Sequence, residues 1–323
     1  MKPRLKFAHL PTPVEALPRL TDLLKGPKLI TKRDDQTGLA FGGNKTRKLE
    51  YLLYEAQAAG ADTLITAGAV QSNHCRQTVA AAAKFGLNCI LVLFGQPPNP
   101  PDGNHFLHYL LGAEVVFTQR EHVQDTLEEV YESVLAKGKQ PYLIPYGGSN
   151  TTGALGYVQA MLELAEQGIH PDWIVFPSSS GGTQAGMLTG ARLSGYRGQI
   201  LGISVDEPET KLQSHVIDLA TQTARSMGET YTFSASDVLV NAEYVGEGYA
   251  MMGAAEIEAI RLFAGYEALL LDPVYTGRAA AGMIDLIRQG FFKSEETVLF
   301  WHTGGGPALF ANLYLRRIVE DKL

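Results

Sequence analysis

Residues 42–50 read GGNKTRKLE, and this stretch places Lys45 just after a pair of glycines. Apolar residues recur at helical spacing from Leu49 onward, so we expect a helix to begin close to the lysine. The glycines leave backbone room for a planar ligand. A lone lysine at a helix start is usually a solvated side chain, so its role depends on what other segments place around it.

Composition indicates a globular protein that acts on small molecules. The chain has 323 residues, 45% of them hydrophobic and 19% charged, which is enough for two lobes with substantial cores. A formal net charge of -7 gives no basic surface for nucleic acid and no attraction to anionic membranes. We therefore predict neither nucleic acid nor a membrane as a partner.

Targeting and redox signals favour a cytoplasmic location. Prolines at positions 11 and 13 follow the basic N-terminus where a secretory signal would need an apolar region. No apolar run approaches the ~18 residues of a membrane span. The two cysteines, Cys75 and Cys89, are too few for a disulfide framework and are typical of buried thiols in a reducing compartment.

Strand and helix signals alternate along the chain. Apolar runs predict strands at 28–32, 63–66, 89–94, 114–117, 142–145, 173–176, 200–205, 269–271 and 298–301. Helical periodicity falls between them, at 49–59, 78–85, 105–111, 126–136, 155–166, 183–193, 256–263 and 279–289. Strands separated by helices form parallel sheets covered on both faces. The sequence therefore predicts a three-layer αβα fold of the α/β class with parallel-rich, twisted sheets.

Polar turns follow the predicted strands at the edge where open parallel sheets bind ligands. In residues 71–74, Ser72 or Asn73 would cap a helix whose free N–H groups can bind a carboxylate. In residues 177–186, backbone N–H groups and the hydroxyls of Ser180 and Thr183 would form a phosphate cradle. The cradle lacks G-x-G-x-x-G, and Asn44 breaks a P-loop pattern before Lys45, so nucleotide binding is not predicted.

Two later turns complete the set of candidate segments. Three glycines in residues 302–308 allow a flat ligand to approach, and Thr303 adds a hydroxyl. Residues 272–277 follow the predicted strand 269–271 and place Tyr275 and Thr276 at its end. Each turn alone is a weak signal, but their joint occurrence is not.

Six runs in a fixed order carry a family resemblance. They are KRDD at 32–35, GGNKTRKLE at 42–50, QSNH at 71–74, GGSN at 147–150, DPVYTG at 272–277 and HTGG at 302–305. With them the chain resembles the D-cysteine desulfhydrase and 1-aminocyclopropane-1-carboxylate deaminase family over about residues 7–312. The resemblance implies pyridoxal 5'-phosphate as cofactor and the tryptophan-synthase-β fold, fold type II.

The resemblance also implies residue roles. Lys45 would hold the cofactor as a Schiff base, and Ser72, Tyr244 and Tyr275 would join it as catalytic residues. Cofactor contacts would come from Lys45, Lys48, Asn73, Ser180, Gly181, Gly182, Thr183, Tyr275, Thr276 and Thr303. The amino-acid substrate would be held by Gln71, Ser72, Asn73 and Tyr244. One departure is Ser179, where the family's phosphate loops tend to carry glycine.

The chemistry requires a buried lysine. A free lysine amine has a pKa of ~10.4, is mostly protonated at neutral pH and cannot attack an aldehyde, so we expect Lys45 to be partly desolvated. Once the substrate's amine has displaced it, the released amine can remove the α-proton as general base.

The group facing the pyridine nitrogen bears on the substrate. The deaminase pattern has a glutamate after the tyrosine, whereas this chain has Thr276, with Thr303 as the other neutral candidate. A hydroxyl lacks the opposing charge that stabilises a pyridinium, which favours prompt loss of a β-leaving group. We therefore expect α,β-elimination of D-cysteine to pyruvate, sulfide and ammonia.

Other activities remain open. L-cysteate sulfo-lyase or another β-eliminating lyase comes next, although the sequence places no cationic seat for a sulfonate. The deaminase is less favoured, and a cofactor-binding protein without turnover is least favoured. A Cys75–His74 nucleophile pair is not expected, because adjacent helical residues diverge by about 100°. No metal site is predicted, since His74 and His302 lack further ligands at suitable spacing.

The resemblance implies a two-domain organisation and a homodimer. A small domain, residues 47–153, would be inserted into a large cofactor-binding domain formed by residues 1–46 and 154–323. The cofactor would lie in the cleft between them.

Overall fold

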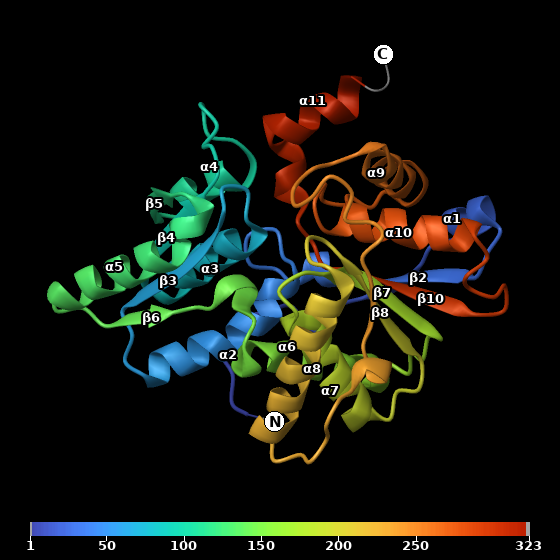
Figure 1. Ribbon diagram of the computed structural model, residues 1–323, viewed down its shortest axis with the longest axis horizontal. Coiled ribbons are helices and arrows are strands. Elements are labelled where there is room, and N and C mark those ends of the chain that lie inside the picture. The colour runs from blue at the N-terminus through green and yellow to red at the C-terminus, as the bar shows by residue number, and fades with distance from the viewer. Residues whose placement is uncertain (1, 321–323) are drawn as a thin grey trace.

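The computed structural model describes residues 2–320, which form two twisted sheets covered by helices (Figure 1). The larger sheet has the strand order β1-β2-β10-β7-β8-β9, and the smaller has β5-β4-β3-β6. All neighbouring strands run parallel except β1 and β2. The predicted three-layer α/β fold with parallel-rich sheets is confirmed.

The strands of each sheet come from different parts of the chain. The larger sheet contains β1 (Val14–Ala16), β2 (Lys28–Arg33), β7 (Trp173–Ser178), β8 (Gln199–Ser204), β9 (Leu239–Asn241) and β10 (Thr297–His302). The smaller sheet contains β3 (Thr63–Ala69), β4 (Asn88–Phe94), β5 (Glu114–Thr118) and β6 (Pro141–Leu143). Because β10 pairs with both β2 and β7, the N-terminal strands are built into the larger sheet.

Helices cover both faces of each sheet. The N-terminal half contains α1 (Pro18–Leu24), α2 (Asn44–Ala58), α3 (Asn73–Phe85), α4 (Gly103–Leu110) and α5 (Val123–Ala136). The C-terminal half contains α6 (Thr151–Glu166), α7 (Gly182–Ser194), α8 (Glu209–Ser226), α9 (Ala254–Glu267), α10 (Thr276–Arg288) and α11 (Asn312–Glu320). Short 3-10 turns follow β2 as η1 (Asp34–Gln36), precede α5 as η2 (Arg120–His122), and follow β6 as η3 (Tyr146–Gly148). Along residues 2–320, no helix combines the length and apolar character that a membrane span needs.

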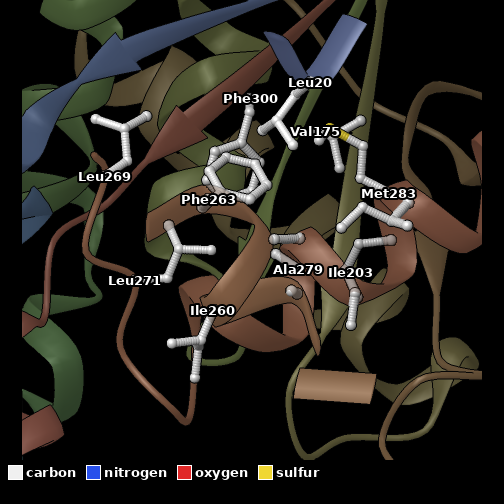
Figure 2. Packing of buried hydrophobic residues seen from close by; sticks show 14 of the residues in the cluster. Leu20, Val175, Ile203, Ile260, Phe263, Leu269, Leu271, Ala279, Met283 and Phe300 are labelled. Carbon is white, nitrogen blue, oxygen red and sulfur yellow. The ribbon is translucent and has the colours of Figure 1, made fainter. Parts of the chain in front are cut away.

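Two apolar cores sandwich the larger sheet. On one face, Phe263 of α9 packs against Phe300 of β10 with ring centroids 5.1 Å apart, and α1 and α10 add Leu20 and Met283 (Figure 2). On the other face, α6, α7 and α8 pack on the sheet, with Tyr157 beside Trp301. Burying such side chains stabilises the fold by about 1.5–3 kcal/mol each. The larger sheet is therefore a rigid platform for the turns at its carboxyl edge.

One predicted strand and several predicted boundaries are wrong. Residues 269–271 form no strand; Leu269 and Leu271 are buried in the core below α9 and α10, which explains their apolar character. Helix α2 begins at Asn44 rather than 49, and α3 begins at Asn73 rather than 78. Their first turns are polar because they either line a cavity or form buried hydrogen bonds and ion pairs, so apolar periodicity did not reveal them.

A buried ionic cluster joins α2 to the larger sheet and to α6. The Arg47 guanidinium donates to both carboxylate oxygens of Asp34 at 2.8 Å and to both of Glu163 at 2.9 Å. The Lys32 amine donates to Glu163 at 2.6 Å. Burial alone would raise the pKa of Asp34, but Arg47 outweighs it and holds that pKa below its usual value. The lysine-bearing helix is thereby fixed against two other elements.

We expect Glu163→Gln to lower the free energy of unfolding by about 3–5 kcal/mol, because it leaves Lys32 and part of the Arg47 guanidinium buried without their carboxylate. Urea unfolding followed by circular dichroism measures the change. The matched control is Glu258→Gln, which breaks a half-exposed pair with Arg288 at 2.6 Å and is expected to change stability by less than about 1 kcal/mol. Equal losses in the two variants would contradict a special role for the cluster.

Candidate active site

The turns predicted to bind ligands meet around one cavity at the carboxyl ends of β3, β7 and β10. This is where parallel α/β sheets usually bind ligands. The lining residues are Asn44, Lys45, Ser72, Asn73, His74, Tyr146, Gly147, Pro177, Ser178, Ser179, Ser180, Gly181, Thr183, Tyr275, Thr303 and Gly304. Eight predicted site residues are among them: Lys45, Ser72, Asn73, Ser180, Gly181, Thr183, Tyr275 and Thr303.

Lys45 lies in the first turn of α2 and faces this cavity. Burial lowers the pKa of its amine to about 8, against the opposing effect of the Asp272 carboxylate. A lower pKa leaves more of the amine neutral at physiological pH, which is the form that attacks a carbonyl carbon. The environment expected for this lysine is present.

The phosphate cradle is formed where β7 passes into α7. Gly181 caps the helix with a φ of 73°, and the Gly182 N–H donates to Ser149 Oγ at 3.2 Å. Ser180 Oγ lies 2.8 Å from the same hydroxyl. A Cβ added to Gly147 would lie only 2.4 Å from Ser180 Oγ, so this glycine permits the close approach of the two loops.

Lys48 lies behind the cradle and does not line the cavity. Its amine donates to Ser149 Oγ and to the Gly147 carbonyl, both at 3.1 Å. Its contact with the phosphate loop therefore runs through Ser149. Burial, with the neighbouring Lys45 ammonium, lowers the pKa of Lys48 well below its usual value.

Ser179 does not distort the loop. The left-handed residue is Gly181, not Ser179, so this position does not need glycine. Burial raises the pKa of the Asp206 carboxyl, and the Ser179 hydroxyl opposes this rise.

The N-terminus of α3 also lines the cavity. Ser72 is the N-cap, and its hydroxyl accepts from the Cys75 N–H at 3.1 Å. Asn73 follows, and its side-chain oxygen accepts from Asn104 at 2.8 Å. Gln71 is not brought into the cavity, because its amide donates to Asp102 at 2.8 Å and accepts from the Asn104 N–H at 2.8 Å.

The tyrosine predicted on the substrate side lies elsewhere. Tyr244 donates to Asp285 at 2.8 Å and packs against Gly282 of α10, away from the cavity lining. The nearby Tyr249 does not line the cavity either, but its hydroxyl lies 2.8 Å from that of Tyr275, which does. Tyr244 and Tyr249 belong to the same irregular, glycine-containing segment, so sequence spacing could not separate them.

Two further residues of the site were not predicted. Tyr146 lines the cavity directly after β6, and burial raises the pKa of its phenol to about 12. Asp272 is fully buried and accepts from the Tyr275 and Thr276 N–H groups, at 3.1 and 2.6 Å, at the start of α10. The motif runs GGSN and DPVYTG adjoin or contain these residues and could have indicated them.

The two candidate threonines are placed differently. The Thr276 hydroxyl donates to the Asp272 carboxylate at 2.8 Å and accepts from the Asp272 N–H at 2.7 Å, and it does not line the cavity. Its role is to complete the cap of α10. Thr303 does line the cavity, so it is the threonine able to face a bound ring.

The donor set fits pyridoxal phosphate. A lysine amine, a helix N-terminus with serine and threonine hydroxyls, and a tyrosine ring surround one cavity. A Cβ added to Gly305 would lie 2.6 Å from Asp272 Cβ and 2.8 Å from Asn73 Nδ2, so the strand-end glycines keep this approach open. The fold and the site together define a pyridoxal-phosphate-dependent enzyme of fold type II.

Comparison with known proteins agrees with this class. Residues 5–304 match the family described as pyridoxal-phosphate dependent enzyme, and the chain belongs to that family. The fold resembles the crystal structure of an ACC deaminase homologue, with a TM-score of 0.90 and 36% identity over 98% of this chain and 96% of that one.

More distant structures share the fold alone. A fungal L-serine ammonia-lyase from Rhizomucor miehei has a TM-score of 0.69 at 18% identity, covering 98% of this chain and all (100%) of its own. Escherichia coli diaminopropionate ammonia lyase has a TM-score of 0.66 at 17% identity, covering 98% and 88%. The cofactor of the family is pyridoxal 5'-phosphate, as the sequence predicted.

Covalent attachment of the cofactor should follow the protonation of Lys45. We expect the attachment rate to rise about tenfold per pH unit and to level off above pH 8, because the pKa of the amine is lowered to about 8 and only its neutral form reacts. Stopped-flow absorbance of the protein mixed with pyridoxal phosphate measures this profile, with Lys45→Ala as the control that shows no attachment. A midpoint near 10.5 would contradict the desolvation of Lys45.

Proposed function

We propose that the protein is a β-eliminating lyase that converts D-cysteine to pyruvate, sulfide and ammonia. The observation that carries the proposal is the neutral hydroxyl of Thr303 in the cavity, together with the absence of any carboxylate among the lining residues in the described part of the chain. A neutral partner does not hold the ring nitrogen protonated. Prompt loss of a β-leaving group is therefore favoured over the slower opening of a cyclopropane ring, which is the deaminase reaction.

Different groups around the cavity have different roles in the proposed reaction. The cofactor, when bound, supplies the electron sink for charge that develops at the substrate's α-carbon. Free N–H groups at the N-terminus of α3, with Ser72 and Asn73, bind the substrate carboxylate. Lys45 is displaced by the substrate amine and removes the α-proton through its Nζ.

The leaving sulfur is directed toward the tyrosines. Burial raises the pKa of Tyr146 to about 12, and it raises those of Tyr249 and Tyr275 well above their usual value. All three phenols are therefore protonated at neutral pH. A protonated phenol can donate a hydrogen bond to the sulfur as the C–S bond breaks and hydrosulfide leaves, and water then hydrolyses the remaining 2-aminoacrylate to pyruvate and ammonia.

L-Cysteate is the second candidate substrate, and the position of the Arg120 side chain favours it. The Arg120 guanidinium lies 5.8 Å from the ring centroid of Tyr249 and 5.5 Å from that of Phe94. The sulfonate group of L-cysteate, and the sulfite that leaves from it, could pair with this guanidinium. Sequence reasoning had placed no such cation.

We further propose the domain division at residues 47–153 and a homodimer. All strands of the smaller sheet fall within 47–153, and all strands of the larger sheet fall outside it, which supports the division. The homodimer is supported by the family resemblance alone.

A substrate panel tests the proposed reaction. Purified protein loaded with pyridoxal phosphate is incubated with D-cysteine, L-cysteine, L-cysteate and aminocyclopropane-carboxylate, and sulfide, sulfite, pyruvate and 2-oxobutyrate are measured. We expect sulfide and pyruvate in equal amounts from D-cysteine. The proposal is wrong if 2-oxobutyrate forms and sulfide does not.

Arg120→Met separates the two sulfur substrates. Because D-cysteine has no anionic β-substituent, we expect its turnover to change less than about threefold, whereas any sulfite release from L-cysteate should fall by about tenfold or more. Arg225→Met, on α8, serves as the matched loss of one surface arginine. Equal losses on both substrates would exclude Arg120 as a sulfonate seat.

A further inference from the structure

The backbone just before Lys45 runs through six consecutive residues in the left-handed region. From Gly38 to Gly43 the φ angles are 80°, 41°, 50°, 71°, 62° and 125°. Three of these residues, Leu39, Ala40 and Phe41, carry a Cβ, which in this region crowds the following carbonyl. Such a conformation persists only where surrounding contacts impose it. We call this segment the 38–43 turn.

A buried arginine from another helix supplies such contacts. Arg76 of α3 is fully buried, and its guanidinium donates to the Ala40 carbonyl and, at 3.2 Å, to the Gly42 carbonyl. Within residues 2–320 it forms no salt bridge, and its Nε has no hydrogen-bond partner. A buried cation without a carboxylate partner is unfavourable. Its contacts go to the carbonyls of the 38–43 turn instead.

The residue after Arg76 reinforces the same connection. Gln77 Oε1 accepts from the Thr46 N–H at 2.8 Å and from the Thr46 hydroxyl at 2.9 Å. Contacts from α3 therefore bracket Lys45, with Arg76 before it and Gln77 after it. The same N-terminal turn of α3 also places Ser72 and Asn73 in the cavity.

We propose that Arg76 is a positioning residue: by holding the 38–43 turn, it orients Lys45 for covalent attachment and for proton transfer. Helix α3 then connects the carboxylate-binding end of the cavity to the lysine through one rigid element. The attachment part needs only the family's cofactor, whereas the proton-transfer part rests on the proposed function.

Arg76→Leu and Arg76→Lys test the proposal. Attachment is measured by the pH midpoint of the absorption band of the Lys45–cofactor linkage, and by borohydride trapping with mass spectrometry of the modified peptide. Turnover is measured as separate kcat and KM values. We expect Arg76→Leu to shift the midpoint and to lower kcat by about 100-fold, the usual effect of misplacing a reacting group, with KM changed less than about threefold. Arg76→Lys keeps the charge, so we expect its midpoint and its kcat to lie between those of the wild type and Arg76→Leu.

A second substitution separates positioning from general stability. Ala40→Gly removes the Cβ that crowds the turn but keeps the carbonyl, so it should restore kcat of Arg76→Leu by about tenfold. Ala268→Gly is the matched control, since Ala268 has a φ of 53° at the C-terminus of α9, far along the chain from the turn. This substitution also removes a Cβ at a positive φ, but we expect it not to raise the kcat of Arg76→Leu.

Each outcome decides the question. Normal attachment and normal kcat in Arg76→Leu would overturn the proposal, as would equal rescue by Ala40→Gly and Ala268→Gly. If Arg76→Leu does not fold, a wild-type midpoint and kcat in Arg76→Lys would overturn it. The attachment readouts need no substrate, so they still decide the role of Arg76 if D-cysteine gives no sulfide and the proposed function fails.

Discussion

The site depends on the hydrogen-bonded ion pairs that the Arg47 guanidinium forms with the carboxylates of Asp34 and Glu163. Arg47 lies two residues after Lys45 and ties α2 to the end of β2 and to α6, all within the buried interior. The Asp34 carbonyl also accepts from the Gly43 N–H at 2.9 Å, so the same residue anchors the backbone on both sides of the lysine. The backbone that carries Lys45 is thus held by buried contacts on both sides of the lysine.

Burial shifts the pKa values around the cavity in two directions. It lowers the pKa values of Lys45 and of Lys48 behind it, and it raises those of the tyrosines. One physical cause, desolvation of the charged form, therefore favours a neutral amine and a protonated phenol in the same pH range. The amine and the phenols respond in opposite directions because the charged form is the protonated one for an amine and the deprotonated one for a phenol.

The sequence predicted the class of fold and the turns of the site, but not which side chain in each turn faces the cavity. Alternating strands and helices, and the order of the motif runs, follow from local pattern. Thr276 does not line the cavity because it takes part in the Asp272 cap of α10. Gln71 does not line it because its side chain is held by Asp102 and Asn104. Tyr249, rather than Tyr244, contacts Tyr275 because of how an irregular segment folds over α10. These are tertiary facts that periodicity cannot encode, and the apolar run at 269–271 was misread for the same reason.

The buried Lys48 amine makes the affinity for the cofactor a matter of proton linkage. Its proton is held weakly, because burial and the neighbouring Lys45 ammonium disfavour the charged form, and its hydrogen bonds go to the neutral oxygens of Ser149 and Gly147. A phosphate dianion in the adjoining cradle supplies the opposing charge and raises that pKa. Phosphate and proton therefore bind together, and by thermodynamic reciprocity each increases the affinity for the other. Alkaline conditions should then loosen the phosphate end of the cofactor even while they favour the neutral amine at Lys45.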